Sequence, residues 1–270
     1  MYRLYGKGKP VVLIHGFGET GDVWEKQVAL LEKDFQLIIP DLPGSGESEM
    51  VDDMSMEGLA EVIKKILEAI SESVSSEAPP SEGFGQVILI GHSMGGYITL
   101  AFAEKYSNYL SAFGLFHSTA FADNDEKKET RKKGIEFVQK HGAFEFLKTS
   151  IPNLFSPVTK EKRPELIDGF INSLRNFSSE AVIQYYRAMM QRPDRTHLLK
   201  TTPLPVLFVL GKYDNAVPFN DGLKLAHMPE KAYIHILYNS GHMGMLEEDE
   251  KSKNILHKFL SETEPLQSAQ

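Results

Sequence analysis

Short apolar runs that alternate with helix-forming segments constrain the fold of this chain more than any other feature. The runs are rich in aliphatic residues and nearly free of polar ones, as strands buried on both faces of a sheet must be. They cover Val11–Ile14, Leu37–Ile39, Val87–Ile90, Ala112–Phe116, Val206–Leu210 and Tyr233–Leu237. Because parallel strands need crossover connections, the alternation predicts an α/β fold with a mostly parallel sheet flanked by helices.

Two helices are predicted from apolar residues that recur at spacings of three and four. One lies between the second and third strands, and the other lies near the end of the chain around Leu256 and Phe259. The apolar face of the first of these helices consists of Leu59, Val62, Ile63, Ile66, Leu67 and Ile70. The Ser-, Pro- and Glu-rich stretch 71–85 is predicted to be an exposed loop, and the tail 261–270 is predicted to be frayed.

The region between Phe116 and Val206 has helix-forming segments and no convincing strand. The predicted helices are Lys127–Lys140, Ala143–Thr149, Pro164–Phe177 and Ser179–Gln191. About 85 residues is too long for a simple crossover connection, so we expect an inserted helical cap. The predicted division places residues 1–117 and 204–270 in the core and 118–203 in the cap.

Composition and charge exclude several classes of protein. The chain of 270 residues is 41% hydrophobic, enough for a sizeable core. Its formal net charge of −8 argues against a nucleic-acid partner, which needs clustered cations. The absence of cysteine excludes disulfides and thiol chemistry. No stretch approaches the ~20 apolar residues of a membrane span and no signal pattern opens the chain, so we expect no membrane association and a cytoplasmic location.

A nucleophile is predicted in the segment 91–96, GHSMGG, which lies between a predicted strand and a helical run. A catalytic serine must project from a sharp turn, and the glycines two residues before and after Ser93 relieve the crowding there. The following helix points its positive N-terminal end at the oxyanion that forms in acyl transfer. The alternative is a serine that only caps a helix. The position between a strand and a helix favours the nucleophile.

An oxyanion hole is predicted from the segment 15–18, HGFG, directly after the first strand. Acyl transfer needs two donors where negative charge develops. Here they are the backbone amides of Phe17 and of Met94, which follows the nucleophile. A simple tight turn is the alternative. His15 is interpreted as a hydrogen-bonded structural residue, and with Gly16 it is counted among the residues around the substrate.

The base is predicted at one of nine histidines. His242 lies in a loop immediately after the last predicted strand. His92 adjoins Ser93 but points another way from the same tight turn, and His117 is counted with Tyr97 among the candidate substrate-binding residues. The other histidines are interpreted as structural or solvated. None forms an HExxH or another metal-spaced cluster, so we expect no metal site.

The acid is predicted at Asp214, in the loop after the strand Val206–Leu210. There its carboxylate accepts a hydrogen bond from His242, fixes the tautomer and stabilises the imidazolium. Asp123 and Asp125, after an earlier strand, are the alternatives. The chain order serine, aspartate, histidine, with each residue in a loop after a strand, carries the assignment.

At these motifs the sequence resembles the α/β-hydrolase superfamily. The resemblance covers Val11 to about Phe116 and Leu204 to Leu260, and the segment 41–48, DLPGSGES, is similar to a structural turn of that family. It implies the α/β-hydrolase fold with an inserted helical cap. Because only residues 1–8 precede the first parallel strand, we expect the usual N-terminal antiparallel strands to be shortened or partly missing.

A serine nucleophile resembles esterases, lipases, C–C bond hydrolases and cofactor-free perhydrolases, whereas dehalogenases and epoxide hydrolases have aspartate at that position. We therefore expect a serine hydrolase that cleaves a carboxylic ester through an acyl-enzyme without a cofactor. The alternatives are a C–C bond hydrolase or lyase, and a small-molecule receptor that keeps the triad. No arginine-rich or acidic clamp is evident near the motifs. The residues beside the motifs predict a small-molecule substrate with an apolar acyl group; they are Phe17, Met94, Tyr97 and His117. The sequence predicts no oligomeric state.

Overall fold

The sheet organises the whole molecule. The computed structural model of the protein describes residues 1–74 and 85–263, and within them seven strands form one sheet in the order β1-β3-β2-β4-β5-β6-β7. β1 pairs antiparallel with β3, and every other pair is parallel. The strands are β1 (Tyr2–Tyr5), β2 (Lys9–Ile14), β3 (Phe35–Pro40), β4 (Val87–His92), β5 (Leu110–Phe116), β6 (Val206–Gly211) and β7 (Ala232–Leu237).

All six predicted strands are present, and each is longer than the sequence indicated. The antiparallel part of the sheet is reduced to the short β1, as expected from the few residues before β2. The mostly parallel sheet predicted from the alternation is therefore confirmed.

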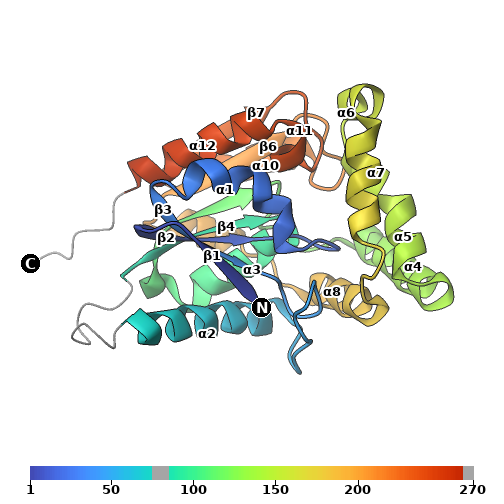
Figure 1. Ribbon diagram of the computed structural model, residues 1–270, viewed down its shortest axis with the longest axis horizontal. Helices are drawn as coiled ribbons and strands as arrows, with labels where there is room; N and C mark the ends of the chain where they lie inside the picture. Colours follow the sequence, from blue (N-terminus) through green and yellow to red (C-terminus); the bar gives the residue numbers. More distant parts are fainter. Residues whose placement is uncertain (75–84, 264–270) are drawn as a thin grey trace, which may run out of the picture.

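Helices cover both faces of the sheet (Figure 1). On one face lie α1 (Glu25–Leu31) and α12 (Asp249–Glu262), and on the other lie α2 (Met56–Val74) and α3 (Met94–Lys105). Alternate residues of each strand point to opposite faces. In β2, Val12 and Ile14 pack with α2 and α3, whereas Val11 and Leu13 pack with α1 and α12. The central strands β4, β5 and β6 are thus buried on both sides, which explains their continuous apolar sequence, whereas the edge strands β1 and β7 are partly exposed.

The segment between β5 and β6 is helical wherever it is regular. Figure 1 shows α4 to α8 gathered at one end of the sheet. The elements are α4 (Asp125–His141), α5 (Ala143–Ser150), the 3₁₀ turn η4 (Ile151–Leu154), α6 (Pro157–Lys162), α7 (Pro164–Ser173), α8 (Ser179–Gln191) and α9 (Thr196–Thr201). The remaining elements are η1 (Gly21–Trp24), η3 (Ser107–Tyr109), α10 (Phe219–Ala226) and α11 (Gly244–Glu247).

Three predicted boundaries are wrong. α2 continues through Val74 into the stretch predicted to be a loop, and the rest of that loop, 75–84, lies outside the described residues. α7 ends at Ser173, before the predicted Phe177, because Ser178 begins the next helix as its N-cap. α12 includes Ser261 and Glu262 of the tail predicted to be frayed, whose remainder, 264–270, is not described. None of the helices within the described residues combines the length and the apolar composition needed to cross a lipid bilayer.

Candidate active site

Ser93 lies in a strained turn between β4 and α3. Its φ of 50° and ψ of −115° fall in a region that side chains rarely adopt, so the surrounding structure must hold it there. The neighbouring glycines are needed for close backbone approach. A Cβ at Gly91 would lie 2.2 Å from the carbonyl oxygen of Gly95, and a Cβ at Gly95 would lie 2.5 Å from that of Ile14. The Ser93 carbonyl accepts a 2.6 Å hydrogen bond from the hydroxyl of Ser118, which further fixes the turn.

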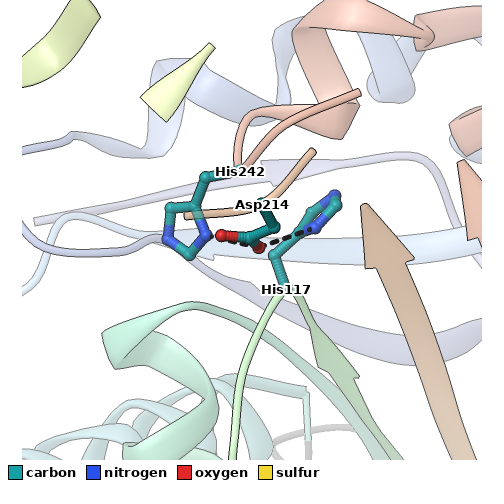
Figure 2. Close-up of side chains that lie close together, drawn as sticks. All are labelled: His117, Asp214 and His242. Atoms are coloured by element: carbon teal, nitrogen blue, oxygen red, sulfur yellow. Dashed lines mark hydrogen bonds and ion pairs between the residues drawn. The ribbon is translucent and has the colours of Figure 1, made fainter. Parts of the chain in front are cut away.

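His242 and Asp214 form a buried pair beside this turn (Figure 2). His242 Nδ1 lies 2.8 Å from Asp214 Oδ2. The other carboxylate oxygen accepts backbone hydrogen bonds from Ala216 at 2.9 Å and Val217 at 2.8 Å. Burial alone would raise the pKa of Asp214, but His242 lowers it well below its ordinary value. Burial lowers the pKa of His242, and the Asp214 carboxylate more than offsets this, so the pKa is raised. The pair therefore favours a protonated His242.

His117 contacts the same carboxylate from the other side. Its Nδ1 lies 3.3 Å from Asp214 Oδ2, but neither ring nitrogen makes a well-aligned hydrogen bond within the described residues. Two glycines make room for the ring, because a Cβ at Gly211 or Gly244 would lie 2.8 or 2.3 Å from its atoms. Burial lowers the pKa of His117. The ring is thus a neutral, tightly enclosed neighbour of the carboxylate.

These three residues also form the one group within the described chain whose donor atoms could approach a common metal ion. The atoms of His117, Asp214 and His242 lie within 4.8 Å of one another, and all three residues are buried. The hydrogen bond of His242 to Asp214 and the 3.3 Å contact of His117 with the same carboxylate account for this convergence without an ion. The absence of a metal site stays a prediction.

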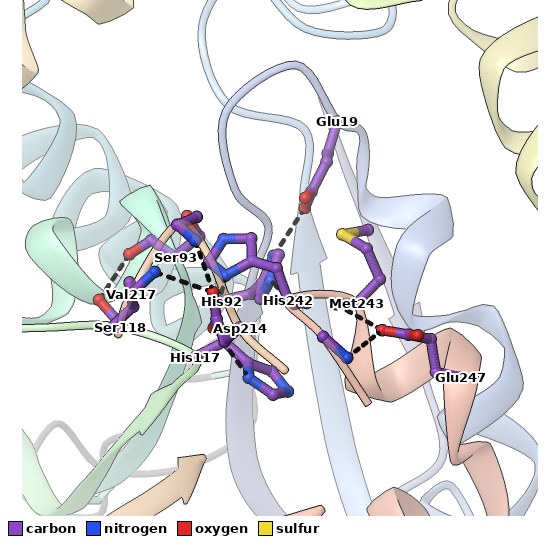
Figure 3. A network of polar contacts seen from close by, with 12 residues as sticks. Glu19, His92, Ser93, His117, Ser118, Asp214, Val217, His242, Met243 and Glu247 are labelled. Carbon is purple, nitrogen blue, oxygen red and sulfur yellow. Dashed lines mark hydrogen bonds and ion pairs between the residues drawn. The ribbon is translucent and has the colours of Figure 1, made fainter. Parts of the chain in front are cut away.

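The loop that carries His242 is held by Glu247, which sequence reasoning missed (Figure 3). One carboxylate oxygen accepts hydrogen bonds from the backbone amides of Gly241 and Met243, at 2.8 and 3.3 Å. The other accepts from the Ser156 amide at 2.8 Å and the Thr159 hydroxyl at 2.7 Å, both between β5 and β6. The backbone amide of His242 also bonds to this segment, because it donates to the carbonyl of Leu154 at 2.7 Å. The histidine loop is therefore tied to the helical segment.

A second buried acid and histidine lie beside the first pair. His92 Nδ1 lies 2.9 Å from Glu19 Oε2, and its Nε2 lies 2.9 Å from the carbonyl oxygen of His242. Because a carbonyl only accepts hydrogen bonds, Nε2 must carry a proton. A second proton must then lie between Nδ1 and the carboxylate, so Glu19 and His92 together are electrically neutral. Burial raises the pKa of Glu19, but His92 lowers it below its ordinary value.

Two backbone donors are free beside Ser93. Met94 begins α3, so its N–H has no intrahelical acceptor. Within the described residues the Phe17 N–H also makes no hydrogen bond. His15 supports the loop from behind, because its Nε2 accepts from the Leu42 amide at 2.9 Å and its Nδ1 lies 2.8 Å from the Gly16 carbonyl. Burial lowers the pKa of His15. These contacts suit a supporting role for His15, which stays a prediction.

A cavity of about 150 Å³ opens onto Ser93 and His242. Phe17 and Tyr97, both selected from the sequence, line it. The ring of Phe17 stacks on Tyr186 with centroids 4.4 Å apart. The helical segment supplies four further apolar side chains, those of Leu147, Ile151, Leu154 and Met189. Asp214 lies behind His242, and His15, Gly16 and His117 do not line the cavity. Their predicted contact with substrate stays a prediction.

The alternative acids are not at this site. Asp123 pairs with Arg131 at 2.5 Å and with Arg192 at 2.9 Å, and Asp125 is exposed at the start of α4. Neither contacts a histidine in the described residues. Asp214 is the carboxylate that meets His242.

Comparisons with known proteins identify a family and several relatives that this chain resembles. The model of a family described as "Alpha/beta hydrolase family" matches residues 11–251. A 2-hydroxy-6-oxo-6-(2'-aminophenyl)hexa-2,4-dienoic acid hydrolase from Metapseudomonas resinovorans is 26% identical over 96% of this chain and 87% of its own length. A pimeloyl-[acyl-carrier protein] methyl ester esterase from Vibrio atlanticus is 25% identical over 92% of each chain. A thermophilic esterase from Thermogutta terrifontis, of known structure, is 28% identical over 97% of this chain and 93% of its own, with a TM-score of 0.89.

Proposed function

The chain belongs to the alpha/beta hydrolase family, and from this premise we propose that the protein is a serine hydrolase that cleaves carboxylic esters through an acyl-enzyme. The membership confirms the fold class predicted from the sequence. In the proposal Ser93 is the nucleophile, His242 the general base and Asp214 the residue that orients the base. The observation that carries it is the buried 2.8 Å contact between His242 and Asp214 at the cavity that Ser93 lines.

In the proposed reaction His242 takes the proton of Ser93 as its oxygen attacks the ester carbonyl carbon. His242 then gives this proton to the leaving alkoxide, so the C–O bond breaks and an acyl-serine remains. In the second half His242 takes a proton from water as the water oxygen attacks the acyl carbon. The proton then passes to the Ser93 oxygen as the acyl C–O bond breaks and the acid leaves. Asp214 holds Nδ1 protonated, which leaves Nε2 free to act as the base, and it stabilises the imidazolium in both halves. The raised pKa of His242 supports this role, because it reflects stabilisation of the charged form.

The negative charge of the tetrahedral intermediate needs donors that are already in place. The free amides of Phe17 and Met94 fit this requirement, as does the N-terminus of α3. Typical losses on removing one such donor are about 10²–10³-fold in kcat. These two amides are therefore proposed as the oxyanion hole.

The helical segment 118–203 is proposed to be a cap that selects the substrate. Its side chains supply much of the apolar wall of the cavity, and its Leu154, Ser156 and Thr159 bind the histidine loop. A small cavity lined in this way suits a small-molecule substrate. The cytoplasmic location expected from the sequence stays a prediction.

Turnover of p-nitrophenyl esters of graded acyl length tests the proposal. Wild type is expected to hydrolyse the short esters, and Ser93→Ala is expected to lose activity on the order of 10⁴-fold or more. Ser173→Ala, which changes an exposed serine in α7, serves as a control and should match wild type. Full activity in Ser93→Ala would overturn the mechanism. Failure of wild type to cleave any ester would favour the C–C bond hydrolase or the receptor.

A further inference from the structure

The cavity beside Ser93 is lined by one cationic side chain that the sequence analysis did not identify. Arg131, in the middle of α4, lines the cavity together with Ser93 and His242. It is the only lysine or arginine among the described lining residues. Its side chain is 17% exposed. No arginine clamp was evident near the motifs in the sequence, because α4 is distant from them along the chain and reaches the cavity only in the folded protein.

The charge of Arg131 is not fully compensated by its neighbours. Asp123 contacts Arg131 Nε at 2.5 Å and Arg192 Nη1 at 2.9 Å, so one carboxylate serves two guanidinium groups. Arg192 is otherwise satisfied, since it donates to the carbonyls of Met189 at 2.7 Å and Phe121 at 3.0 Å. The cluster therefore has a net charge of about +1 at neutral pH.

One end of the Arg131 guanidinium is available to a ligand. Nε and Nη2 both face Asp123, and within the described residues Nη1 makes no hydrogen bond. Tyr186 packs on the group with its ring centroid 5.3 Å from Cζ, which fixes its orientation. Burial lowers the pKa of Arg131, and Asp123 more than offsets this. A charged, oriented donor with a free face is the usual protein partner of a carboxylate.

The other charged groups at the cavity do not oppose an anion there. Glu19 also lines the cavity, but it lies 2.9 Å from His92 and shares a proton with that ring, so the pair is neutral. Asp214 lies behind His242 and is engaged by two backbone amides. The net positive charge of the lining is therefore at Arg131.

We propose that Arg131 binds a carboxylate of the substrate, so that the preferred substrates are esters that carry a second, ionised carboxyl group. This inference rests on the proposed ester hydrolysis at Ser93 and adds the charge of the substrate. The apolar wall contacts the methylene chain, and the guanidinium holds its anionic end. Arg131 is then a specificity-determining residue.

Matched pairs of anionic and neutral esters test the proposal. Monomethyl glutarate and methyl pentanoate differ only in a carboxylate or a methyl on the acyl side, and 4-acetoxybutanoate and butyl acetate differ likewise on the alcohol side. Released acid is titrated at constant pH for wild type, Arg131→Gln, Arg131→Lys and Lys132→Gln. Lys132 lies next to Arg131 on α4 but its side chain is 62% exposed, so its variant is a charge-matched control.

We expect wild type to prefer the anionic member of at least one pair. Arg131→Gln should lower the ratio of kcat/KM for the anionic over the neutral ester about 10- to 100-fold, Arg131→Lys should restore part of it, and Lys132→Gln should keep the wild-type ratio. Asp123 keeps Arg192 as a partner in both Arg131 variants, which favours folding. A wild-type preference for the neutral ester in both pairs, or an unchanged ratio in Arg131→Gln, would overturn the proposal.

Binding separates this proposal from ester hydrolysis itself. Calorimetry measures the affinity of Ser93→Ala for monomethyl glutarate and for 4-acetoxybutanoate, with and without Arg131→Gln. If wild type cleaves no ester, but Ser93→Ala binds one of these two anions and loses that binding on Arg131→Gln, the carboxylate site is supported and the proposed function is refuted. If wild type cleaves neutral esters and Ser93→Ala binds neither anion, ester hydrolysis is supported and the carboxylate site is refuted.

Discussion

Replacement of Glu247 by glutamine tests how the histidine loop is held. Glu247 is 8% exposed, and its carboxylate accepts four hydrogen bonds, two on each oxygen. Glutamine keeps only one acceptor oxygen. The side-chain NH2 group of the glutamine is best placed toward Ser156 and Thr159. There the Thr159 hydroxyl can change from donor to acceptor and accept a hydrogen bond from the new N–H. The Ser156 amide then loses its acceptor and faces another donor.

The expected cost follows from these contacts. An orphaned buried donor costs about 1–3 kcal/mol, and the two remaining bonds lose their charge assistance, so Glu247→Gln should lower the free energy of unfolding by about 2–4 kcal/mol. Because two of the donors flank His242, displacement of its ring should also lower kcat, by about 10- to 100-fold for a shift near 1 Å. KM should change less, since the cavity wall is not altered.

Urea unfolding and steady-state kinetics measure both effects. Glu250→Gln is the matched control, because Glu250 is 78% exposed and pairs only with Lys253. It should change the unfolding free energy by no more than about 0.5 kcal/mol. If Glu247→Gln behaves like Glu250→Gln in both assays, Glu247 does not hold the loop as the hydrogen bonds indicate.

Other predictions concern the base and the nucleophile turn. His242 must be neutral to accept a proton and its pKa is raised, so kcat/KM should fall as pH drops through a midpoint above the ordinary 6.5; an acid limb centred at or below 6.5 would contradict this. Asp214→Asn should move that limb to lower pH and lower kcat on the order of 10³–10⁴-fold, measured by pH profiles of both proteins. Gly95→Ala should destabilise the fold by about 1–3 kcal/mol because its Cβ would meet backbone oxygens, whereas Gly169→Ala, with nothing within 4 Å, should be neutral or stabilising in thermal melts; equal melting temperatures would refute the crowding argument.

The sequence predicted those parts of the molecule that depend on local patterns. Strands such as Val206–Leu210 were identified because burial on both faces leaves a continuous apolar run. The Ser93 turn was identified because its close backbone contacts require glycine at neighbouring positions. The contact between Asp214 and His242 followed from topology, since loops after neighbouring parallel strands meet at one edge of the sheet.

Residues whose roles depend on long-range contacts were not found. Glu19 and Glu247 are acidic residues in loops or short helices, and nothing local distinguishes them from exposed acids. Arg131 lies among lysines and acids in a helix that reads as solvated, and only the packing of α4 brings it to the cavity. The end of α2 was misplaced because Ser, Glu and Val continue a helix without a clear stop signal.

Identification of the labelled residue tests the central claim most directly. A p-nitrophenyl phosphonate reacts with an activated serine to form a stable adduct, and mass spectrometry of the digested protein locates it. The account predicts one adduct per chain, on the peptide that contains Ser93, and none in Ser93→Ala. Asp214→Asn should be labelled much more slowly. An adduct on another residue, or equal labelling of Ser93→Ala, would contradict the assignment of Ser93 as the nucleophile.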